Sequence, residues 1–453
     1  MKRTLMSTPV KKMTLLSLAI PILIEQVLRN LMGTVNVFML GNISDDAVAA
    51  VGVANQIMNV VVIAFTMIAA GAAVVINQTL GAKKYEESAK ISMNALTASG
   101  GLGLLVSLVL FFFSEAFVRM VGLEEALLAD AVLYLKITGG TAVAMALSMM
   151  CSNIFRSYGN ARIPMAVVLL NNILNILGSC LVIFQPFPFP LRGVMGVAVV
   201  RAGSEVVGLL FQIVLLAVSH FGFKLRDLIS IRLSNLRRIF SIGLMSSVEG
   251  LSYTMGQVVT TSFLTGLGTV ALSAKVYVQN IDYYAYVMGL AIGQATQIMA
   301  GHLMGAEDYD GAYHFVKRNW RYVVLCNAVF GSLMFIFARP ILSLFTSDPQ
   351  VIALARQLLF VNMFIHIGRS FNHSFNYGLR SVGYVFWPMI IAACSIWLCN
   401  VGLGYVFSTV FSLGAVGLWL AQMTDEWVRG IATTILWLRR GWEKALRARK
   451  EKA

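Results

Sequence analysis

The sequence is poor in charged residues. Of its 453 residues, 58% are hydrophobic and only 12% are Asp, Glu, Lys or Arg. A water-soluble fold of this length exposes much more polar surface, so the composition excludes soluble classes of protein. Apolar runs of about 18 or more residues recur along the whole chain, and each is long enough to cross the hydrocarbon core of a bilayer. The sequence therefore predicts an all-α integral membrane protein.

Motifs typical of several other functions are missing. No G-x-x-x-x-G-K-[S/T] segment occurs, which disfavours an ATP-driven pump. The five cysteines lie in apolar runs without a C-x-x-C pair, so we expect core residues rather than metal ligands. The acidic pair Asp45-Asp46 has no second acidic motif, which disfavours a metal-dependent membrane enzyme. We expect no enzymatic activity and no cofactor, and a receptor or channel remains an alternative.

Acidic residues are also few, with 21 against 35 basic residues. The basic residues lie in short loops and in both tails rather than in one patch, so no nucleic-acid partner is expected. Twenty-five of them fall in one alternating set of connections and in the tails, and five fall in the other set. The positive-inside rule then predicts a plasma (inner) membrane protein with both termini in the cytoplasm. We expect the basic tail, Trp442 to Lys452, to lie on the anionic inner leaflet.

Twelve apolar runs are separated by turns that contain Gly, Pro or Asn. We expect spans at 14–40, 47–79, 89–113, 127–155, 163–184, 192–218, 238–264, 271–304, 314–337, 350–379, 384–407 and 414–438. Residues 1–218 would form an N-terminal six-helix lobe and 238–438 a C-terminal one. Residues 219–237 would be a cytoplasmic linker and 439–453 a basic cytoplasmic tail. A monomer surrounded by membrane lipid is expected.

The two halves of the chain resemble each other at an offset of 224 residues. Gly81-Ala82 corresponds to Gly305-Ala306, and Arg156 and Gly159 with Pro164-Met165 correspond to Arg380 and Gly383 with Pro388-Met389. In the last span of each half the offset is 221, which aligns Glu205 with Glu426. Six spans per repeat give both halves the same orientation in the membrane. Parallel repeats of this kind are typical of secondary transporters, with the substrate site between halves that rock around it.

Two glutamates lie deep in equivalent spans. Glu25 is eleven residues into the first span, about 16 Å at 1.5 Å per residue, and its repeat equivalent is Glu249. A charge at the bilayer centre costs about 2.5–3.5 kcal/mol, so each requires an explanation. Glu25 either pairs with Arg29, one helical turn later, or binds a coupling cation. Glu249 has no basic residue four positions away, which favours a role in ion coupling.

Further charges interrupt the later spans. In the eighth span, Lys275 is a candidate to neutralise the charge of Glu249. Asp282, in the same span, is a candidate to bind an ion together with Glu249, and this ion could be Na⁺. Structural salt bridges are expected at i,i+4 within two spans: Arg201 with Glu205, and Asp425 with Arg429. His366 and His373 form a histidine pair in the tenth span, for which helix packing and pH sensing are both open. Amides on expected inner faces are candidates for a substrate cavity: Gln26, Gln56, Asn175, Gln257, Gln279 and Asn280.

The motifs together resemble one transporter family. These are Pro21 with Gly33-x-x-Asn36, Gly41 and Ala49-Ala50-Val51-Gly52, the twin Arg-x-x-Gly and Pro-Met segments, and the turns Leu80-Gly81-Ala82 and Met304-Gly305-Ala306. From about residue 16 to residue 437 the chain resembles multidrug and toxic compound extrusion (MATE) transporters. The resemblance implies a twelve-helix, two-lobed exporter of organic cations or drug-like molecules that exchanges them for Na⁺ or H⁺.

The chain departs from the family pattern in its first and tenth spans. Many members carry an acidic residue where this chain has Asn36, and an amide can coordinate Na⁺ but cannot release a proton. Asn36 is therefore a candidate coupling-ion ligand for Na⁺ only. Arg369 stands where some members carry an acid. A flippase for a lipid-linked sugar or another lipid, from the same superfamily, is the alternative function.

Overall fold

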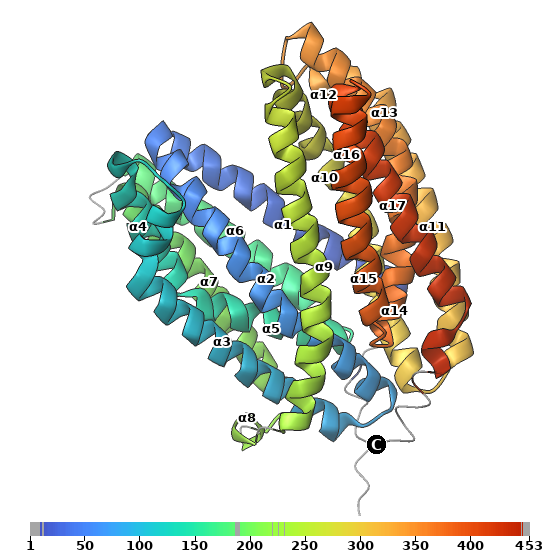
Figure 1. Ribbon diagram of the computed structural model, residues 1–453. Coiled ribbons are helices and arrows are strands. Elements are labelled where there is room, and N and C mark those ends of the chain that lie inside the picture. Colours follow the sequence, from blue (N-terminus) through green and yellow to red (C-terminus); the bar gives the residue numbers. More distant parts are fainter. Residues whose placement is uncertain are drawn as a thin grey trace, which may run out of the picture. The chain divides into compact units, whose positions relative to one another are not determined.

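The computed structural model of the protein describes residues 10, 13–185, 191–219, 221–224, 226–230, 232–444 and 446. The chain divides into two compact units, and Figure 1 shows each as a bundle of long helices. The first, here called the N-lobe, comprises Met1–Leu80 and Lys84–Leu244; the second, the C-lobe, comprises Gly81–Lys83 and Met245–Ala453. The border between these two units lies inside a helix, α9 (Leu233–Thr265). The predicted linker 219–237 therefore groups with the N-lobe.

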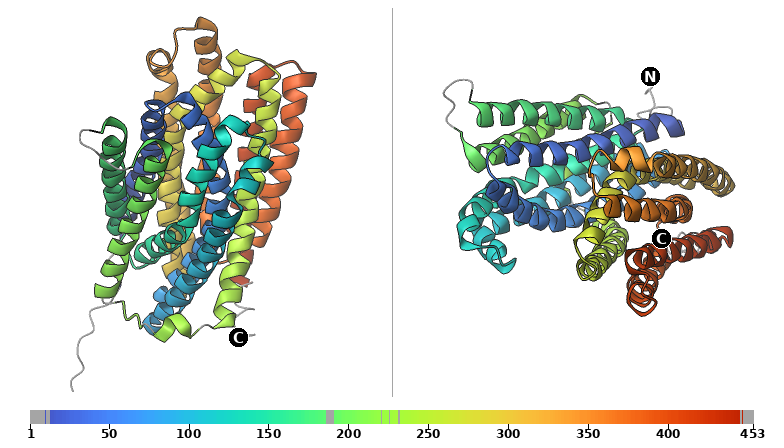
Figure 2. Two further views of the ribbon diagram at one scale, coloured as in Figure 1. Left: turned by 90° about the vertical axis from the view of Figure 1, so that its left-hand side faces the viewer. Right: turned by 90° about the horizontal axis from the view of Figure 1, so that it is seen from above.

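The N-lobe is built from five long helices and one bent pair. They are α1 (Leu15–Gly41), α2 (Asp45–Gly81), α3 (Tyr85–Met120), α4 (Glu125–Gly140), α5 (Ala142–Ser157), α6 (Arg162–Phe184) and α7 (Gly193–Val218), followed by the short α8 (Arg226–Ile229). The predicted span 127–155 is bent by 45° where α4 meets α5. α1 lies beside α6 and α6 beside α7, while α3 packs on α4 and α5 (Figure 2). α1 continues through Pro21.

The C-lobe repeats this order with different local geometry. Its helices are α9, α10 (Thr269–Gly305), α11 (Tyr309–Ile336), α12 (Ala338–Leu342), α13 (Pro349–Phe371), α14 (Tyr377–Ser381), α15 (Phe386–Ser395), α16 (Leu403–Tyr405) and α17 (Gly414–Leu438). A π-helical segment, Asn372–Asn376, joins α13 to α14, and two more, Ile396–Gly402 and Val406–Val410, flank α16. α13 lies beside α10, α11 and α17.

Eight helical segments are long and apolar enough to cross a membrane, and the bent pair α4–α5 makes a ninth. Three further helices, α9, α10 and α17, are of spanning length but more polar. Together these give twelve segments of spanning length among the described residues. The three polar helices all belong wholly or partly to the C-lobe, where most of the buried charges lie.

Local sequence explains where several helices begin. At the start of α1, the Thr14 hydroxyl accepts a hydrogen bond from the backbone N–H of Ser17, and the Ser17 hydroxyl accepts one from Thr14 in return. α13 begins at Pro349, whose ring suits the first helical position, and Asp348 caps it by accepting from the Gln350 N–H. The repeat is also visible in the core. The small residues Ala50 and Ala274, 224 positions apart, are both fully buried in the cores of their own lobes.

Two side chains of α3 hydrogen-bond to the backbone of the segment after α7. The Asn94 amide donates to the carbonyls of Asp227 and Ser230 and accepts from the Arg232 N–H, and the Thr97 hydroxyl donates to the carbonyl of Leu228. The predicted tail lies mostly outside the described residues. Within the described part, the Trp442 ring stacks on Trp437 at 4.8 Å between centroids.

Candidate substrate and ion-coupling site

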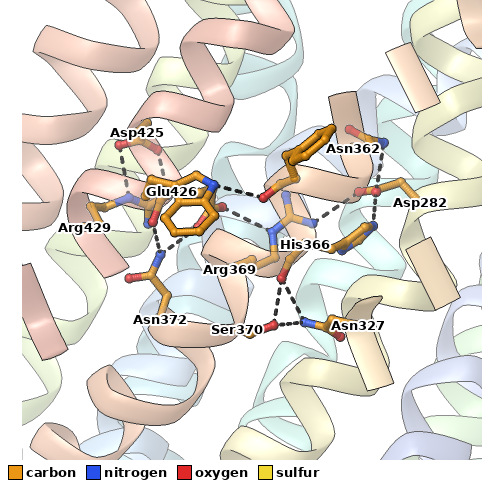
Figure 3. A network of polar contacts seen from close by, with 12 residues as sticks. Asp282, Asn327, Asn362, His366, Arg369, Ser370, Asn372, Asp425, Glu426 and Arg429 are labelled. Carbon is orange, nitrogen blue, oxygen red and sulfur yellow. Dashed lines mark hydrogen bonds and ion pairs between the residues drawn. The ribbon is translucent and has the colours of Figure 1, made fainter. Parts of the chain in front are cut away.

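A network of buried charged and amide side chains runs through the C-lobe (Figure 3). It begins on α10 at Asp282, whose carboxylate accepts from His366 Nε2 at 2.6 Å, from the Asn362 amide at 2.9 Å and from Arg369 Nη1 at 3.3 Å. The three donors all come from α13 at i, i+4 and i+7, so they share one face of that helix. The Asn362 oxygen in turn accepts from the Trp419 ring N–H. Asp282 is thus held by one helix.

The same network continues from α13 to α17. Arg369 Nε donates to Glu426 at 3.2 Å, and Glu426 also accepts from the Asn372 amide at 2.7 Å and from Arg429 at 3.2 Å. Arg429 forms a second ion pair with Asp425 at 2.6 Å, which confirms the predicted i,i+4 bridge. The network contains three carboxylates and two guanidinium groups. With His366 neutral its formal charge is therefore −1, and a proton on His366 or a bound cation brings it to zero.

Part of this network lines a cavity of about 230 Å³ in the C-lobe. Its walls carry four aromatic rings (Tyr253, Tyr283, Tyr286, Trp419), four amides (Gln257, Gln279, Asn362, Gln422), Val278 and the charged Asp282 and Arg369. Predicted cavity residues Gln257 and Gln279 are in this lining. Asn280 is exposed, and its amide donates to the carbonyl of Val276 on its own helix. The carboxylate and rings form a surface that suits an organic cation, because aromatic faces attract positive charge.

The two repeat-related glutamates are each paired with a repeat-related arginine. In the N-lobe, Glu25 is fully buried and accepts from Arg156 at 2.5 Å and from Arg29 at 3.1 Å. In the C-lobe, Glu249 accepts from Arg380 at 2.7 Å and from the Asn376 amide at 2.9 Å. Each glutamate is 131 residues before its arginine. The predicted Glu25–Arg29 pair is present, and sequence reasoning missed Arg156 and Arg380, although the duplicated Arg-x-x-Gly motif already marked both.

Other predicted partners around Glu249 differ in the structure. Lys275 donates to the hydroxyl of Thr261 rather than to Glu249, because the Glu249 carboxylate already binds Arg380. Asp282 and Glu249 have separate sets of hydrogen-bonding partners, and a Na⁺ site shared by the two carboxylates stays a prediction. Among the described residues no three His, Cys, Asp or Glu side chains are grouped as metal ligands. The role of either carboxylate in ion coupling stays a prediction.

The predicted salt bridge between Arg201 and Glu205 in α7 is wrong. Arg201 Nη1 instead donates to the Asn55 oxygen of α2 at 2.9 Å and to the Tyr134 hydroxyl of α4 at 2.7 Å. Glu205 accepts from the Asn171 amide of α6 at 3.3 Å. The i,i+4 spacing allows the pair, but each long side chain reaches a polar group on a neighbouring helix instead.

The remaining predicted N-lobe residues differ in their burial. Asn36, in α1, is half-buried, and its side-chain oxygen is enclosed without a hydrogen-bond donor. Gln56 is exposed, while Asn175 is buried and accepts from Ser179 of the same helix at 3.4 Å. Gln26 follows Glu25 in α1 and is half-buried. Their assignment to a substrate cavity stays a prediction.

Comparison with known proteins identifies the family. The model of the MatE family matches residues 21–181 and 246–406, one match in each half of the chain. The chain therefore belongs to the MATE family of transporters and is a multi-pass integral membrane protein. The predicted fold class, with two related halves, is confirmed, as is the prediction that the protein is not an enzyme.

Three similar proteins illustrate the range of the family. The uncharacterized transporter YisQ of Bacillus subtilis is 36% identical over 443 residues, covering 97% of each chain. A probable multidrug resistance protein NorM of Thermotoga maritima is 26% identical, covering 95% of this chain and 93% of its own. A solved multidrug resistance MATE transporter in an outward-facing conformation has the same fold, with a TM-score of 0.88 at 20% identity, over 97% of this chain and 100% of that one.

Proposed function

We propose that this MATE transporter exports organic cations or drug-like molecules by antiport with Na⁺ or H⁺. It would act as a monomer in the plasma membrane, with both termini in the cytoplasm and alternating access between the two lobes. The probable multidrug resistance protein of Thermotoga maritima and the solved multidrug resistance transporter support this direction. The observation that carries the proposal is the C-lobe cavity, where Asp282 lies among four aromatic rings.

The cavity supplies what binding of an organic cation requires. Aromatic faces contribute about 0.5–2 kcal/mol each to binding a cation, depending on how well water is excluded. The Asp282 carboxylate adds a direct counter-charge. Ligand pockets typically enclose about 300–1,000 Å³, so this cavity of about 230 Å³ suits the charged part of a drug-sized molecule.

The same carboxylate offers a simple basis for antiport. Asp282 belongs both to the cavity wall and to a network that carries one more carboxylate than guanidinium. A coupling cation that neutralises this negative charge competes with a cationic substrate for Asp282. Binding of either the coupling cation or the substrate at Asp282 therefore releases the other, which is the exchange that antiport requires. Lys275, also on α10, lies seven residues earlier, about 10 Å along the helix, and its ammonium group donates to Thr261.

Transport of ethidium by the purified protein in lipid vesicles tests this proposal. Na⁺ and pH gradients are imposed separately, and a pH-sensitive dye reports proton movement. We expect Asp282→Asn to reduce gradient-driven ethidium transport at least about tenfold, since substitution removes the competing charge. Asn280→Ala, on the same helix but exposed, is the matched control and should transport normally.

Glu25→Gln and Glu249→Gln belong in the same experiment. Because both carboxylates bind arginine side chains, we expect these variants to lose stability without changing which ion drives transport. If either variant stays stable and loses only its ion dependence, that glutamate is the coupling site and Asp282 is not. If the wild type moves no cation under any gradient, the exporter proposal fails and lipid-linked substrates become the next candidates.

A further inference from the structure

Arg201 is a positive charge within the N-lobe whose direct partners among the described residues are neutral. Its guanidinium group donates to the Asn55 amide oxygen and to the Tyr134 hydroxyl, and Glu205 is bound to Asn171 instead. Arg201 is eight residues into α7, about 12 Å along the helix axis, which is below the level of the lipid phosphates. An arginine inside the bilayer is costly, and in transporters such residues typically line substrate or ion pathways.

The way Arg201 is held leaves one edge of its guanidinium group open. Both hydrogen bonds use Nη1, so the Nε–Nη2 edge has no protein partner among the described residues. Neither of those two nitrogens is among the enclosed polar atoms of the described residues, so each keeps some accessible surface. This edge presents two parallel N–H groups, the arrangement that binds a carboxylate or phosphate with two hydrogen bonds. Asn55 and Tyr134 fix the group from two other helices, so the edge is oriented before a ligand binds.

The internal repeat indicates which face of the N-lobe this edge belongs to. At the offset of 224, Asn55 of α2 corresponds to Gln279 of α10, and at the offset of 221, Arg201 of α7 corresponds to Gln422 of α17. Gln279 and Gln422 both line the C-lobe cavity. Asn55 and Arg201 therefore occupy the equivalent positions of the N-lobe, with a guanidinium group in place of an amide.

We propose that Arg201, with Asn55 and Tyr134, forms a binding site in the N-lobe for the oxyanion of an organic substrate, in the first place a carboxylate. The proposal rests on the proposed transport function and narrows its substrate class. It predicts that the protein favours molecules that carry a carboxylate, beside or instead of a cationic group. The depth of Arg201 favours a substrate carboxylate over a lipid phosphate, which stays near the bilayer surface.

Two fluorescent dyes that differ in one group test this site. Rhodamine 6G is a cationic ethyl ester, and rhodamine 19 is the same molecule with a free carboxylate. Fluorescence polarisation measures the dissociation constant of each dye for the purified wild-type protein in lipid nanodiscs. We expect the wild type to bind rhodamine 19 about tenfold more tightly than rhodamine 6G, and Arg201→Gln to remove that preference while rhodamine 6G affinity changes less than about twofold.

Two further variants separate the carboxylate site from a structural role. Arg201→Lys keeps the positive charge but loses the two parallel N–H groups, so this variant should retain only part of the preference for rhodamine 19. Glu205→Gln should leave the preference intact, because Glu205 does not contact Arg201. The proposal is overturned if the wild type does not distinguish the dyes, or if Arg201→Gln still does.

The same nanodiscs distinguish the possible sources of the oxyanion. Discs of phosphatidylcholine alone are compared with discs that also contain phosphatidylglycerol. If phosphatidylglycerol stabilises the wild type but not Arg201→Gln, and neither prefers rhodamine 19, the site holds a lipid phosphate and the substrate proposal is wrong. Binding needs no ion gradient, so this result is independent of the transport assay. Failure to move rhodamine 6G under any gradient would instead count against the proposed export function.

Discussion

At the scale of single residues, the two lobes pair an equivalent carboxylate, fully buried at Glu25 and partly buried at Glu249, with different numbers of positive partners. Glu25 binds two guanidinium groups, from Arg156 and Arg29. Glu249 binds one guanidinium group, from Arg380, and one neutral amide. Removing one partner of a buried ion pair leaves an uncompensated charge, which costs much more than the pair itself contributes. The repeat therefore provides two versions of one pair for comparison.

We predict that Arg380→Met destabilises the protein more than Arg156→Met. Loss of Arg380 leaves Glu249 with one neutral amide as its hydrogen-bond partner, at a cost of at most about 3 kcal/mol for this partly exposed pair, whereas Glu25 keeps Arg29 after loss of Arg156. Thermal unfolding of the two variants in detergent, followed by tryptophan fluorescence, measures the order. Adding Glu249→Gln to Arg380→Met should recover much of the loss, because the unpaired charge is then removed. Equal melting temperatures for the two single variants would contradict the argument.

At the scale of helices, two glycines allow α2 and α9 to touch backbone to backbone within the N-lobe. A Cβ atom at Gly243 would lie 2.0 Å from the carbonyl oxygen of Met67, and one at Gly71 would lie 2.0 Å from that of Ile239. Small residues permit such close approach between membrane helices. The start of α9 is therefore held by the N-lobe, although the rest of this helix belongs to the C-lobe.

We predict that Gly243→Ala lowers both the melting temperature and the transport rate. The added methyl group meets backbone, which cannot rotate away, so the two helices must separate. Gly250→Ala, two turns later in α9, is the matched control. A Cβ at that position would meet no atom within 4 Å beyond its own stretch of helix, and alanine favours the helix by about 1 kcal/mol over glycine. Comparable losses in both variants would mean that glycine matters for bending α9 rather than for its contact with α2.

A comparison of single helices with the sequence predictions shows which features the sequence could predict. Hydropathy and the repeat predicted the spans and their grouping, because both depend on residue type along the chain. The bend between α4 and α5 and the π-helical segments of the C-lobe depend on packing between helices, which hydropathy does not record. For the site, the i,i+4 rule predicted Asp425–Arg429 and Glu25–Arg29 correctly but Arg201–Glu205 wrongly. Long side chains can pair with groups on their own helix or on neighbouring helices, and sequence spacing alone does not predict which pair forms.

At the scale of the whole molecule, a parallel duplication predicts on which side of the membrane each loop lies. The excess of basic residues in alternate connections predicts that both termini lie in the cytoplasm, and six spans per half predict that equivalent loops lie on the same side of the membrane. Ala82 and Ala306 are exposed repeat equivalents in loops predicted to be cytoplasmic. Ala126 and Gln350 are exposed equivalents predicted to face outward.

Labelling of single cysteines tests this arrangement in cells. The five native cysteines are replaced, and one cysteine is introduced at each of these four positions in turn. We expect a membrane-impermeant maleimide added outside intact cells to label Ala126→Cys and Gln350→Cys, and to label Ala82→Cys and Ala306→Cys only after the cells are opened. The control is a permeant maleimide, which should label all four. Opposite behaviour within either pair would indicate an inverted repeat, because only parallel halves place equivalent loops on one side of the membrane.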